Sequence, residues 1–310
     1  MSMYLVTGAA GFIGAAVAKK LIRDGHRVVT IDNLSTGYES AIPEGCEVII
    51  GDCQDPNVYE KIPQGKYAAV LHIAGQSSGE ISFDDPSYDL QTNAESTLQI
   101  LKFCLRNGCK RIIYASTVSV YGIKPDRPVT ELDEAKPESF YGVGKLASEH
   151  YLRIYQNYGV NSTCLRLFNV YGPGQNLNNM RQGMVSIYLS QMLKNEHIQV
   201  KGSADRFRDF VYIDDVVYAF ISSIERADSF GGVINVATGV KTRVCDLIDG
   251  LIISYDKQVT VEYLGSTDGD VHGIYGCNQK MIDSFGFSEV TPLKTGLTKM
   301  ISWAKKQLLE

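Results

Sequence analysis

The chain has 310 residues, 44% hydrophobic and 21% charged, with a formal net charge of −5, which is ordinary for a globular protein with a substantial core. The mildly acidic balance argues against a nucleic-acid partner, and no apolar stretch reaches the roughly 18 residues of a membrane span. Seven scattered cysteines without metal-ligand spacing, and no room for a signal peptide before the first apolar run, lead us to expect a cytoplasmic protein with reduced thiols and no metal.

Short apolar runs alternate with helical patterns through the first half of the chain. Strands are expected at residues 4–8, 27–32, 48–52, 68–75, 111–116 and 162–168, and helices at 12–25, 93–108 and 139–159. Residues 169–183 are typical of a loop, 214–227 predict a capped helix and 231–239 another buried strand. Continuous apolar strands separated by helices indicate an α/β fold: a doubly wound (Rossmann-type) parallel sheet, with a smaller, interleaved α/β domain.

The stretch "TGAAGFIG" places Gly8, Gly11 and Gly14 between the first strand and the first helix. Glycines there allow a tight turn, close approach of a pyrophosphate and close packing of the helix, whose N-terminus attracts the anion. Asp32 ends the second strand, where an acceptor for a ribose hydroxyl is expected. Because an acid there repels a 2′-phosphate, the pattern favours NAD over NADP. The alternative is a packing turn followed by a surface aspartate.

The stretch "SFYGVGK" sets Tyr141 and Lys145 four residues apart, on one face of the expected helix. A free tyrosine has a pKa of about 10, and a neighbouring ammonium together with a positive nicotinamide ring lowers that pKa toward the working pH of a base. Gly142 and Gly144 predict a turn that lies close to the cofactor or the sheet. The loop after residues 111–116 can bring Thr117 within reach of Tyr141. Taken alone, the pattern is very common and more often means a packing tyrosine beside a solvated lysine; its position after residues 111–116 is what favours the catalytic interpretation.

Together these motifs resemble the extended short-chain dehydrogenase/reductase superfamily, and within it the nucleotide-sugar epimerases typified by UDP-glucose 4-epimerase. The resemblance covers nearly the whole chain. It rests on "TGAAGFIG", "IDNLSTG", "GDCQD", "HIAGQ", "STVSVYG", "SFYGVGK", "RLFNVYGPG" and "RDFVYIDDV", in family order and at family spacing.

The resemblance implies a role for each matching position. Thr117, Tyr141 and Lys145 are expected to be catalytic, and Asn169, Arg208 and Asp270 to bind the nucleotide sugar together with Thr117 and Tyr141. The alternative for Arg208 is a surface ion pair with Asp205 or Asp209. Besides the three glycines, Tyr141 and Lys145, the residues expected to contact NAD are Phe12, Ile13, Asp32, Asn33, Ser35, Thr36, Gly37, Asp52, Cys53, Ile73, Ala74, Gly75, Gln76, Asn93 and Phe168.

Two departures from the family pattern bear on the reaction. Members that dehydrate or decarboxylate their sugar carry an acid just after the catalytic threonine, where this chain has Val118 and Ser119, so dehydration is disfavoured. Thr267 stands where many relatives have a phosphate-binding arginine, and a threonine cannot make that charge-assisted contact. Arg206 or Arg181 could take over the role.

The expected function is NAD-dependent inversion of C4 of a UDP-linked hexose through a 4-keto sugar. The alternatives are a nucleotide 4-keto-sugar reductase and a non-catalytic NAD-binding sensor, although a sensor has no use for Thr117, Tyr141 and Lys145. The NAD-binding domain is expected at residues 1–168 plus about 210–237, and the substrate domain at 169–209 plus 238–310. Relatives pair the helices corresponding to 93–108 and 139–159, so a homodimer is expected. Which sugar is bound stays open; Ile274 and residues 175–185 are expected to shape its pocket.

Overall fold

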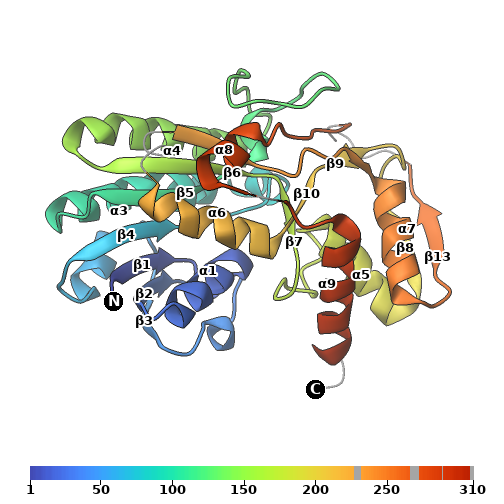
Figure 1. The fold of residues 1–310 in the computed structure, drawn as a ribbon, viewed down its shortest axis with the longest axis horizontal. Coiled ribbons are helices and arrows are strands. Elements are labelled where there is room, and N and C mark those ends of the chain that lie inside the picture. The colour runs from blue at the N-terminus through green and yellow to red at the C-terminus, as the bar shows by residue number, and fades with distance from the viewer. Residues whose placement is uncertain (227–231, 266–271, 288, 308–310) are drawn as a thin grey trace.

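A seven-stranded parallel sheet forms the centre of the protein, in a computed structural model that describes residues 1–226, 232–265, 272–287 and 289–307 (Figure 1). The strand order is β3-β2-β1-β4-β5-β6-β11, and all neighbours are parallel. The predicted doubly wound sheet is confirmed. The strands are β1 (Met3–Thr7), β2 (Arg27–Asp32), β3 (Cys46–Ile50), β4 (Tyr67–His72), β5 (Arg111–Thr117), β6 (Asn161–Leu167) and β11 (Gly232–Val236).

Helices cover both faces of this sheet, which explains why its strands are almost continuously apolar. In β1, Tyr4 and Val6 point into the core on one face while Leu5 points into the core on the other, because side chains alternate along a strand. The first face is covered by α1 (Phe12–Arg23) and α6 (Ile213–Glu225), and the second by α3 (Ser96–Arg106) and α4 (Phe140–Tyr155). A short helix, α2 (Pro86–Leu90), leads through a π-helical turn (Gln91–Glu95) into α3.

Beyond one end of the sheet, the later part of the chain forms a smaller α/β unit (Figure 1). The segment predicted as loop, 169–183, begins with a short strand that pairs with β10. The helices of this part are α5 (Met184–Asn195), α7 (Val244–Tyr255) and α9 (Leu293–Gln307), whereas α8 (Gln279–Phe285) returns to the sheet and packs against β11 and α6. Its paired strands are β7 (Asn169–Tyr171) with β10 (Phe210–Tyr212), β8 (His197–Val200) with β13 (Thr260–Tyr263), and β9 (Phe207–Arg208) with β12 (Thr242–Arg243).

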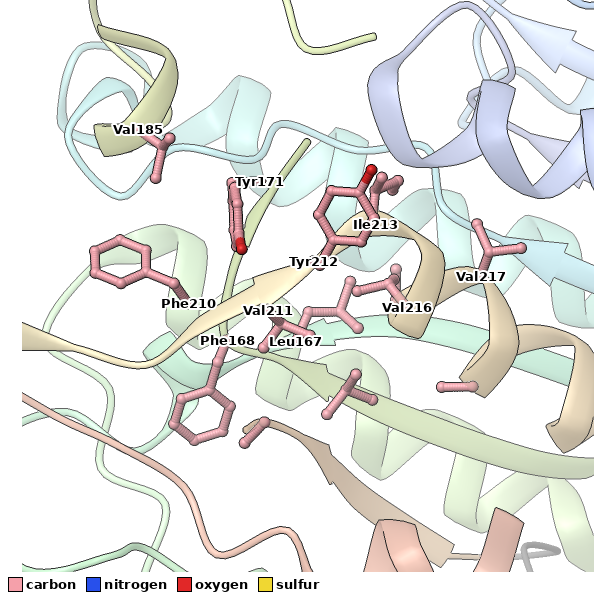
Figure 2. Packing of buried hydrophobic residues seen from close by; sticks show 14 of the residues in the cluster. Leu167, Phe168, Tyr171, Val185, Phe210, Val211, Tyr212, Ile213, Val216 and Val217 are labelled. Carbon is pink, nitrogen blue, oxygen red and sulfur yellow. The ribbon is translucent and has the colours of Figure 1, made fainter. Parts of the chain in front are cut away.

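One apolar core runs from the sheet into the smaller unit. Phe168 follows β6, and Tyr171 and Tyr212 lie on the paired strands β7 and β10, where Tyr171 packs edge-on against Tyr212 at 5.7 Å (Figure 2). The same cluster reaches Val185 at the start of α5 and continues into α7 and α9. The two-domain division drawn from the sequence therefore stays a prediction, since the two parts share their hydrophobic core.

No helix in the described ranges is both long and apolar enough to cross a lipid bilayer. The seven cysteines are all free thiols, and Cys53, Cys104, Cys109 and Cys164 are buried. Burial raises the pKa of the Cys46 thiol to about 11, so that it stays protonated at neutral pH.

Candidate active site

The turn between β1 and α1 is built from glycines that no other residue could replace without displacement. Gly8 has a positive φ of 82°, and a Cβ there would lie 2.9 Å from the Ala74 backbone nitrogen. A Cβ on Gly14 would collide with the Gly8 carbonyl, so the first turn of α1 lies directly on the end of β1. The N-terminus of α1 thus opens onto the carboxyl edge of the sheet without an intervening side chain, the arrangement that suits a pyrophosphate.

Asp32 is held at the end of β2 by backbone amides. Its Oδ2 accepts a hydrogen bond from the Ala10 amide and its Oδ1 from the Leu34 amide, both at 2.8 Å. Leu34 adopts a left-handed φ of 58°, which turns the following residues back toward the glycine loop. Asn33 Nδ2 donates to Asp52 Oδ1 at 2.6 Å and joins the ends of β2 and β3. The carboxylate that the sequence assigned to a ribose is therefore fixed at the rim of the glycine turn.

A cavity of about 560 Å³ lies over this edge of the sheet, within the usual range for cofactor sites. Gln54 and Gln175 also line it, and their buried amide oxygens lack a partner within the described structure, as expected for acceptors that a ligand satisfies. The glycine cradle, Asp32 and these acceptors fit a dinucleotide. The predicted cofactor residues in its lining are Gly8, Gly11, Phe12, Ile13, Gly14, Asp32, Asn33, Ser35, Thr36, Gly37, Asp52, Cys53, Ile73, Ala74, Gly75 and Gln76.

Tyr141 lies in the first turn of α4, which begins because Ser139 Oγ accepts a hydrogen bond from the Gly142 amide at 3.1 Å. Its side chain is buried, and the Thr117 side chain at the end of β5 favours its phenolate form. Burial raises the pKa of Tyr141 to about 12, against the opposing effect of Thr117. In the protein alone the pKa is thus raised, because desolvation outweighs the effect of Thr117 and the charge of Asp89 acts in the same direction as desolvation. The lowering expected from the sequence includes the charge of a bound nicotinamide ring.

Lys145 lies one turn further along α4 and is also buried. Its ammonium donates to the Ala115 carbonyl at 3.0 Å, and lies 4.8 Å from the centre of the Tyr114 ring and 5.9 Å from that of Tyr141. Burial lowers the pKa of Lys145 to about 8, and the charge of Asp89 opposes that shift. The lysine therefore keeps its proton at neutral pH in a site where a positive charge is costly.

The two glycines between Tyr141 and Lys145 have a different role from the one expected. A Cβ on Gly142 would lie 2.7 Å from the Ser119 carbonyl oxygen, and one on Gly144 would lie 3.3 Å from Asp89 Oδ2. These glycines make room for the loop after β5 and for the end of α2, not for the sheet or the cofactor cavity.

Asn93 lies at the centre of the π-helical turn, behind Gly75. Its amide nitrogen donates to the Gln76 carbonyl and to Asp89 Oδ1, both at 3.1 Å, and Gln76 Nε2 donates to the same carboxylate oxygen at 2.9 Å. A Cβ on Gly75 would collide with Asn93 Oδ1 and would lie 3.4 Å from Lys145 Nζ. Gly75 thus brings the wall of the cavity directly against the lysine. Sequence reasoning missed Asp89, although its position four residues before Asn93 in one helical stretch was a usable signal.

The expected substrate residues lie outside the lining of this cavity. Asn169 Nδ2 donates to the Asp209 carbonyl at 3.1 Å, and Arg208 Nη1 donates to the Phe207 carbonyl at 2.8 Å and to the His272 carbonyl at 3.4 Å. The Asp209 carboxylate accepts from the amides of Thr238, Gly239 and Gly276. Phe168, expected near the nicotinamide, is buried beside Gly276. Asp270 and Thr267 lie outside the described residues.

The two arginines considered as substitutes for position 267 are engaged elsewhere. Arg206 Nε donates to the Ser203 carbonyl at 3.2 Å. Arg181 Nη1 pairs with Asp84 at 2.8 Å, and the next residue, Gln182, donates to Ser77 Oγ at 2.7 Å. These contacts attach the 175–182 loop to the segment after β4, over the cavity. The loop that the sequence placed at the sugar pocket thus lines the cofactor cavity, with Gln175, Asn176, Leu177, Asn178, Asn179 and Gln182. The sequence did not suggest the further lining residues Ser77, Leu193, Lys194, Trp303 and Gln307.

Comparison with known proteins explains this constellation. A sequence profile described as the NAD dependent epimerase/dehydratase family matches residues 4–237. The chain belongs to this family. A Methanocaldococcus jannaschii protein, provisionally named UDP-glucose 4-epimerase, is 34% identical over 98% of each chain. An Escherichia coli dTDP-4-dehydro-6-deoxyglucose reductase is 27% identical over 96% of each chain.

Solved structures share the whole fold. A UDP-glucose 4-epimerase of Thermotoga maritima, solved with UDP-glucose, superposes with a TM-score of 0.93 at 32% identity, covering 99% of this chain and all of that one. A UDP-N-acetylglucosamine 4-epimerase of Methanobrevibacter ruminantium gives 0.92 at 29% identity, over 99% and 98% of the two chains. The predicted family is confirmed: this is an enzyme of the NAD-dependent epimerase family, and its cofactor is NAD.

Proposed function

We propose that the protein inverts C4 of a UDP-linked hexose through a 4-keto intermediate. The observation that carries the proposal is the grouping of Thr117, Tyr141 and Lys145 at the carboxyl edge of β5, against the Gly75 wall of the cofactor cavity. A buried phenol near a threonine hydroxyl, with an ammonium one turn away, is suited to moving a proton on and off a sugar hydroxyl.

In this proposal each side chain has a separate task. When bound, NAD would supply the hydride acceptor for C4 of the sugar and, once the keto sugar has turned in the site, the hydride donor to its other face. Tyr141 takes the proton of the C4 hydroxyl, either directly or through Thr117, and gives it back when the keto group is reduced. Lys145 stabilises the phenolate form in which Tyr141 accepts that proton, because its pKa of about 8 leaves the lysine charged at neutral pH. Phe12, Ile13 and the glycine turn hold the pyrophosphate, and Asp32 the adenosine ribose.

The choice of nucleotide and reaction rests on the relatives and on the departures in this sequence. UDP-sugars appear in the names of the M. jannaschii, T. maritima and M. ruminantium proteins, which supports a UDP-linked substrate. Val118 and Ser119 offer no acid beside Thr117, and the two follow β5 directly. Elimination of water from the sugar needs such an acid, so epimerisation is favoured over dehydration. Arg208, Asn169 and Asp270 are proposed to hold the nucleoside diphosphate.

The second candidate is a nucleotide 4-keto-sugar reductase, supported by the E. coli reductase among the relatives. An epimerase regenerates its cofactor in each cycle, whereas a reductase consumes NAD(P)H. We expect NAD to copurify with the protein, and added UDP-glucose, UDP-galactose or their N-acetylated forms to interconvert without supplied cofactor, followed by chromatography of the sugar nucleotides. Turnover of a 4-keto sugar only when NADPH or NADH is added would identify the reductase, and no turnover of any nucleotide sugar would favour a sensor.

We further propose that the protein is a homodimer formed through α3 and α4. Both helices carry apolar side chains on the side turned away from the sheet, including exposed Leu105, Val143 and Ile154. A second copy of the same face would cover them symmetrically.

A further inference from the structure

Asp89 is a buried carboxylate with no place in the chemistry described so far. It lies in α2, only 1% exposed, and its two oxygens have different surroundings. Oδ1 accepts from Gln76 Nε2 at 2.9 Å and from Asn93 Nδ2 at 3.1 Å. Oδ2 is buried without a hydrogen-bond partner in the described structure and faces the backbone of Gly144. An unpaired buried carboxylate oxygen is strongly unfavourable unless a nearby positive charge compensates it.

That positive charge is Lys145. Asn93 stands between the two groups, since its nitrogen donates to Asp89 Oδ1 while its oxygen is turned toward the space shared by Gly75 and Lys145 Nζ. Both N–H bonds of the Asn93 amide are used, one by Asp89 and one by the Gln76 carbonyl. These two partners therefore determine which way the Asn93 amide nitrogen and oxygen point. Without Asp89, the amide could rotate and present a donor to the ammonium.

The other ionisable groups around the lysine carry no negative charge toward it. Tyr114 on β5 and Tyr141 on α4 are buried phenols, and burial keeps the pKa of each above its ordinary value. Burial and the lysine charge lower the pKa of His72 on β4 to about 3, so that it is neutral. Glu149, one turn further along α4, is paired with Arg166 at 2.7 Å. Asp89 is the anion among the groups that face Lys145.

We propose that Asp89 is a positioning residue of the reaction, which holds Gln76 and Asn93 in place and serves as the counter-ion that keeps Lys145 charged beside Tyr141. It does not touch the substrate. The inference rests on the proposed roles of Tyr141 and Lys145. The negative charge of Asp89 acts on Lys145 and on Tyr141: it favours the protonated lysine and disfavours the phenolate. Because it raises both pKa values, it moves the whole pH optimum to higher pH. Gly144 belongs to the arrangement, because any side chain there would press on Asp89 Oδ2 and on Asn93.

The test is the pH profile of kcat for Asp89→Asn, an isosteric change that keeps an acceptor for Gln76 and Asn93 and removes the charge. Loss of a negative charge lowers the pKa of both neighbours, so both limbs of the profile should move to lower pH, by about one pH unit. If the pKa of Lys145 falls from about 8 to about 7, its protonated fraction at pH 8 falls about fivefold, and we expect kcat on this alkaline limb to fall by the same factor while KM changes little. Asp85→Asn is the matched control: Asp85 caps the same helix through the Tyr88 amide, is exposed, and should leave the profile unchanged.

A second measurement does not depend on turnover. The ultraviolet absorbance of phenolate is titrated with pH in the cofactor-free protein. The difference between the wild type and Tyr141→Phe reports the pKa of Tyr141. Asp89→Asn should lower this pKa. If Asp89→Asn does not fold, Asp89→Ser is measured in the same way. An active variant with an unshifted profile and an unshifted Tyr141 titration would overturn the inference while leaving the epimerase intact. A wild type inactive on every sugar nucleotide would instead overturn the proposed function.

Discussion

At the scale of single residues, burial acts in opposite directions on the two ionisable groups of the site. It raises the pKa of Tyr141 from 10.0 to about 12 and lowers that of Lys145 from 10.5 to about 8, so two values that nearly coincide in water move apart in the protein. In the cofactor-free protein the Tyr141 phenol therefore holds its proton more tightly than the Lys145 ammonium does. The motif Y-x-x-x-K indicated that these residues would meet, but their environment could not be read from the motif, because it comes from β4, β5 and α2.

Replacing Tyr141 by phenylalanine removes the proton acceptor and keeps the packing of the ring. We expect kcat to fall about 10²–10⁴-fold, the usual contribution of a general base. NAD content and thermal stability should stay near the wild-type values. Tyr158→Phe, an exposed tyrosine near the end of the same helical stretch, is the control and should retain full activity. Near wild-type turnover by Tyr141→Phe would remove this residue from the mechanism.

Arg208 tests the substrate side of the proposal. If it carries charge that Thr267 cannot supply, Arg208→Ala should raise KM for the nucleotide sugar by about 10- to 150-fold, the equivalent of one charged hydrogen bond. Binding of NAD, measured separately, should be unaffected. Arg243→Ala, an exposed arginine paired with Asp246 at 2.8 Å, provides the control. Thr267→Arg should tighten binding of free UDP. An unchanged KM in Arg208→Ala would mean that the diphosphate is held by other residues.

At the scale of elements, the first turn of α4 is shaped by what lies against it. Alanine is favoured over glycine inside a helix by about 1 kcal/mol. At Gly142, however, a Cβ would lie 2.7 Å from both the Ser119 carbonyl oxygen and the Pro137 side chain. Gly142→Ala should therefore destabilise the protein by about 1–2 kcal/mol, the usual range for overpacking, in denaturant unfolding. Lys19→Ala, at an exposed position of α1 outside the proposed dimer face, should have little effect. A more stable Gly142→Ala protein would contradict this account of the turn.

The outer face of α3 and α4 leads to a prediction about assembly. Light scattering at micromolar concentration should give twice the mass of the chain. Ala147→Arg places a long charged side chain in the middle of this face of α4 and should give a monomer, because two copies would meet at that position. Ile253→Arg, at an exposed apolar position on α7, is the control and should remain dimeric. A wild type that is monomeric throughout would refute the proposed contact.

The sequence predicted the sheet well because its signal is local. Each buried parallel strand is an apolar run of typical strand length, and the glycines after β1 predict the start of the first helix. Two features could not be predicted from the local sequence. The helix expected from residue 93 is preceded by a π-helical turn over Gln91–Glu95, and nothing in those five residues marks the change of winding. Trp303 joins the cofactor cavity from almost the other end of the chain, a contact that depends on tertiary packing and leaves no local pattern.

At the scale of the whole molecule, the cofactor cavity joins the glycine turn to the 175–182 loop and to α9. A ligand held by all three parts stabilises the folded state of both units at once. We expect NAD at 100 times its dissociation constant to add about 2.7 kcal/mol to the free energy of unfolding. NADP at the same concentration should add much less, since Asp32 would face the 2′-phosphate. Equal stabilisation by the two dinucleotides, measured as shifts in Tm, would show that Asp32 does not lie at the ribose.

The apolar core shared by the sheet and the smaller unit bears on how a dinucleotide could leave. Separating the two units like the halves of a clamp would expose the aromatic cluster around Tyr171 and Tyr212 to water, which is unfavourable in proportion to the area uncovered. Exit would then depend on the surface loop held by Gln182 and Arg181, whose polar contacts are easier to break. A bound dinucleotide would have a long residence time compared with a catalytic cycle, and the enzyme would behave as though the cofactor were a prosthetic group.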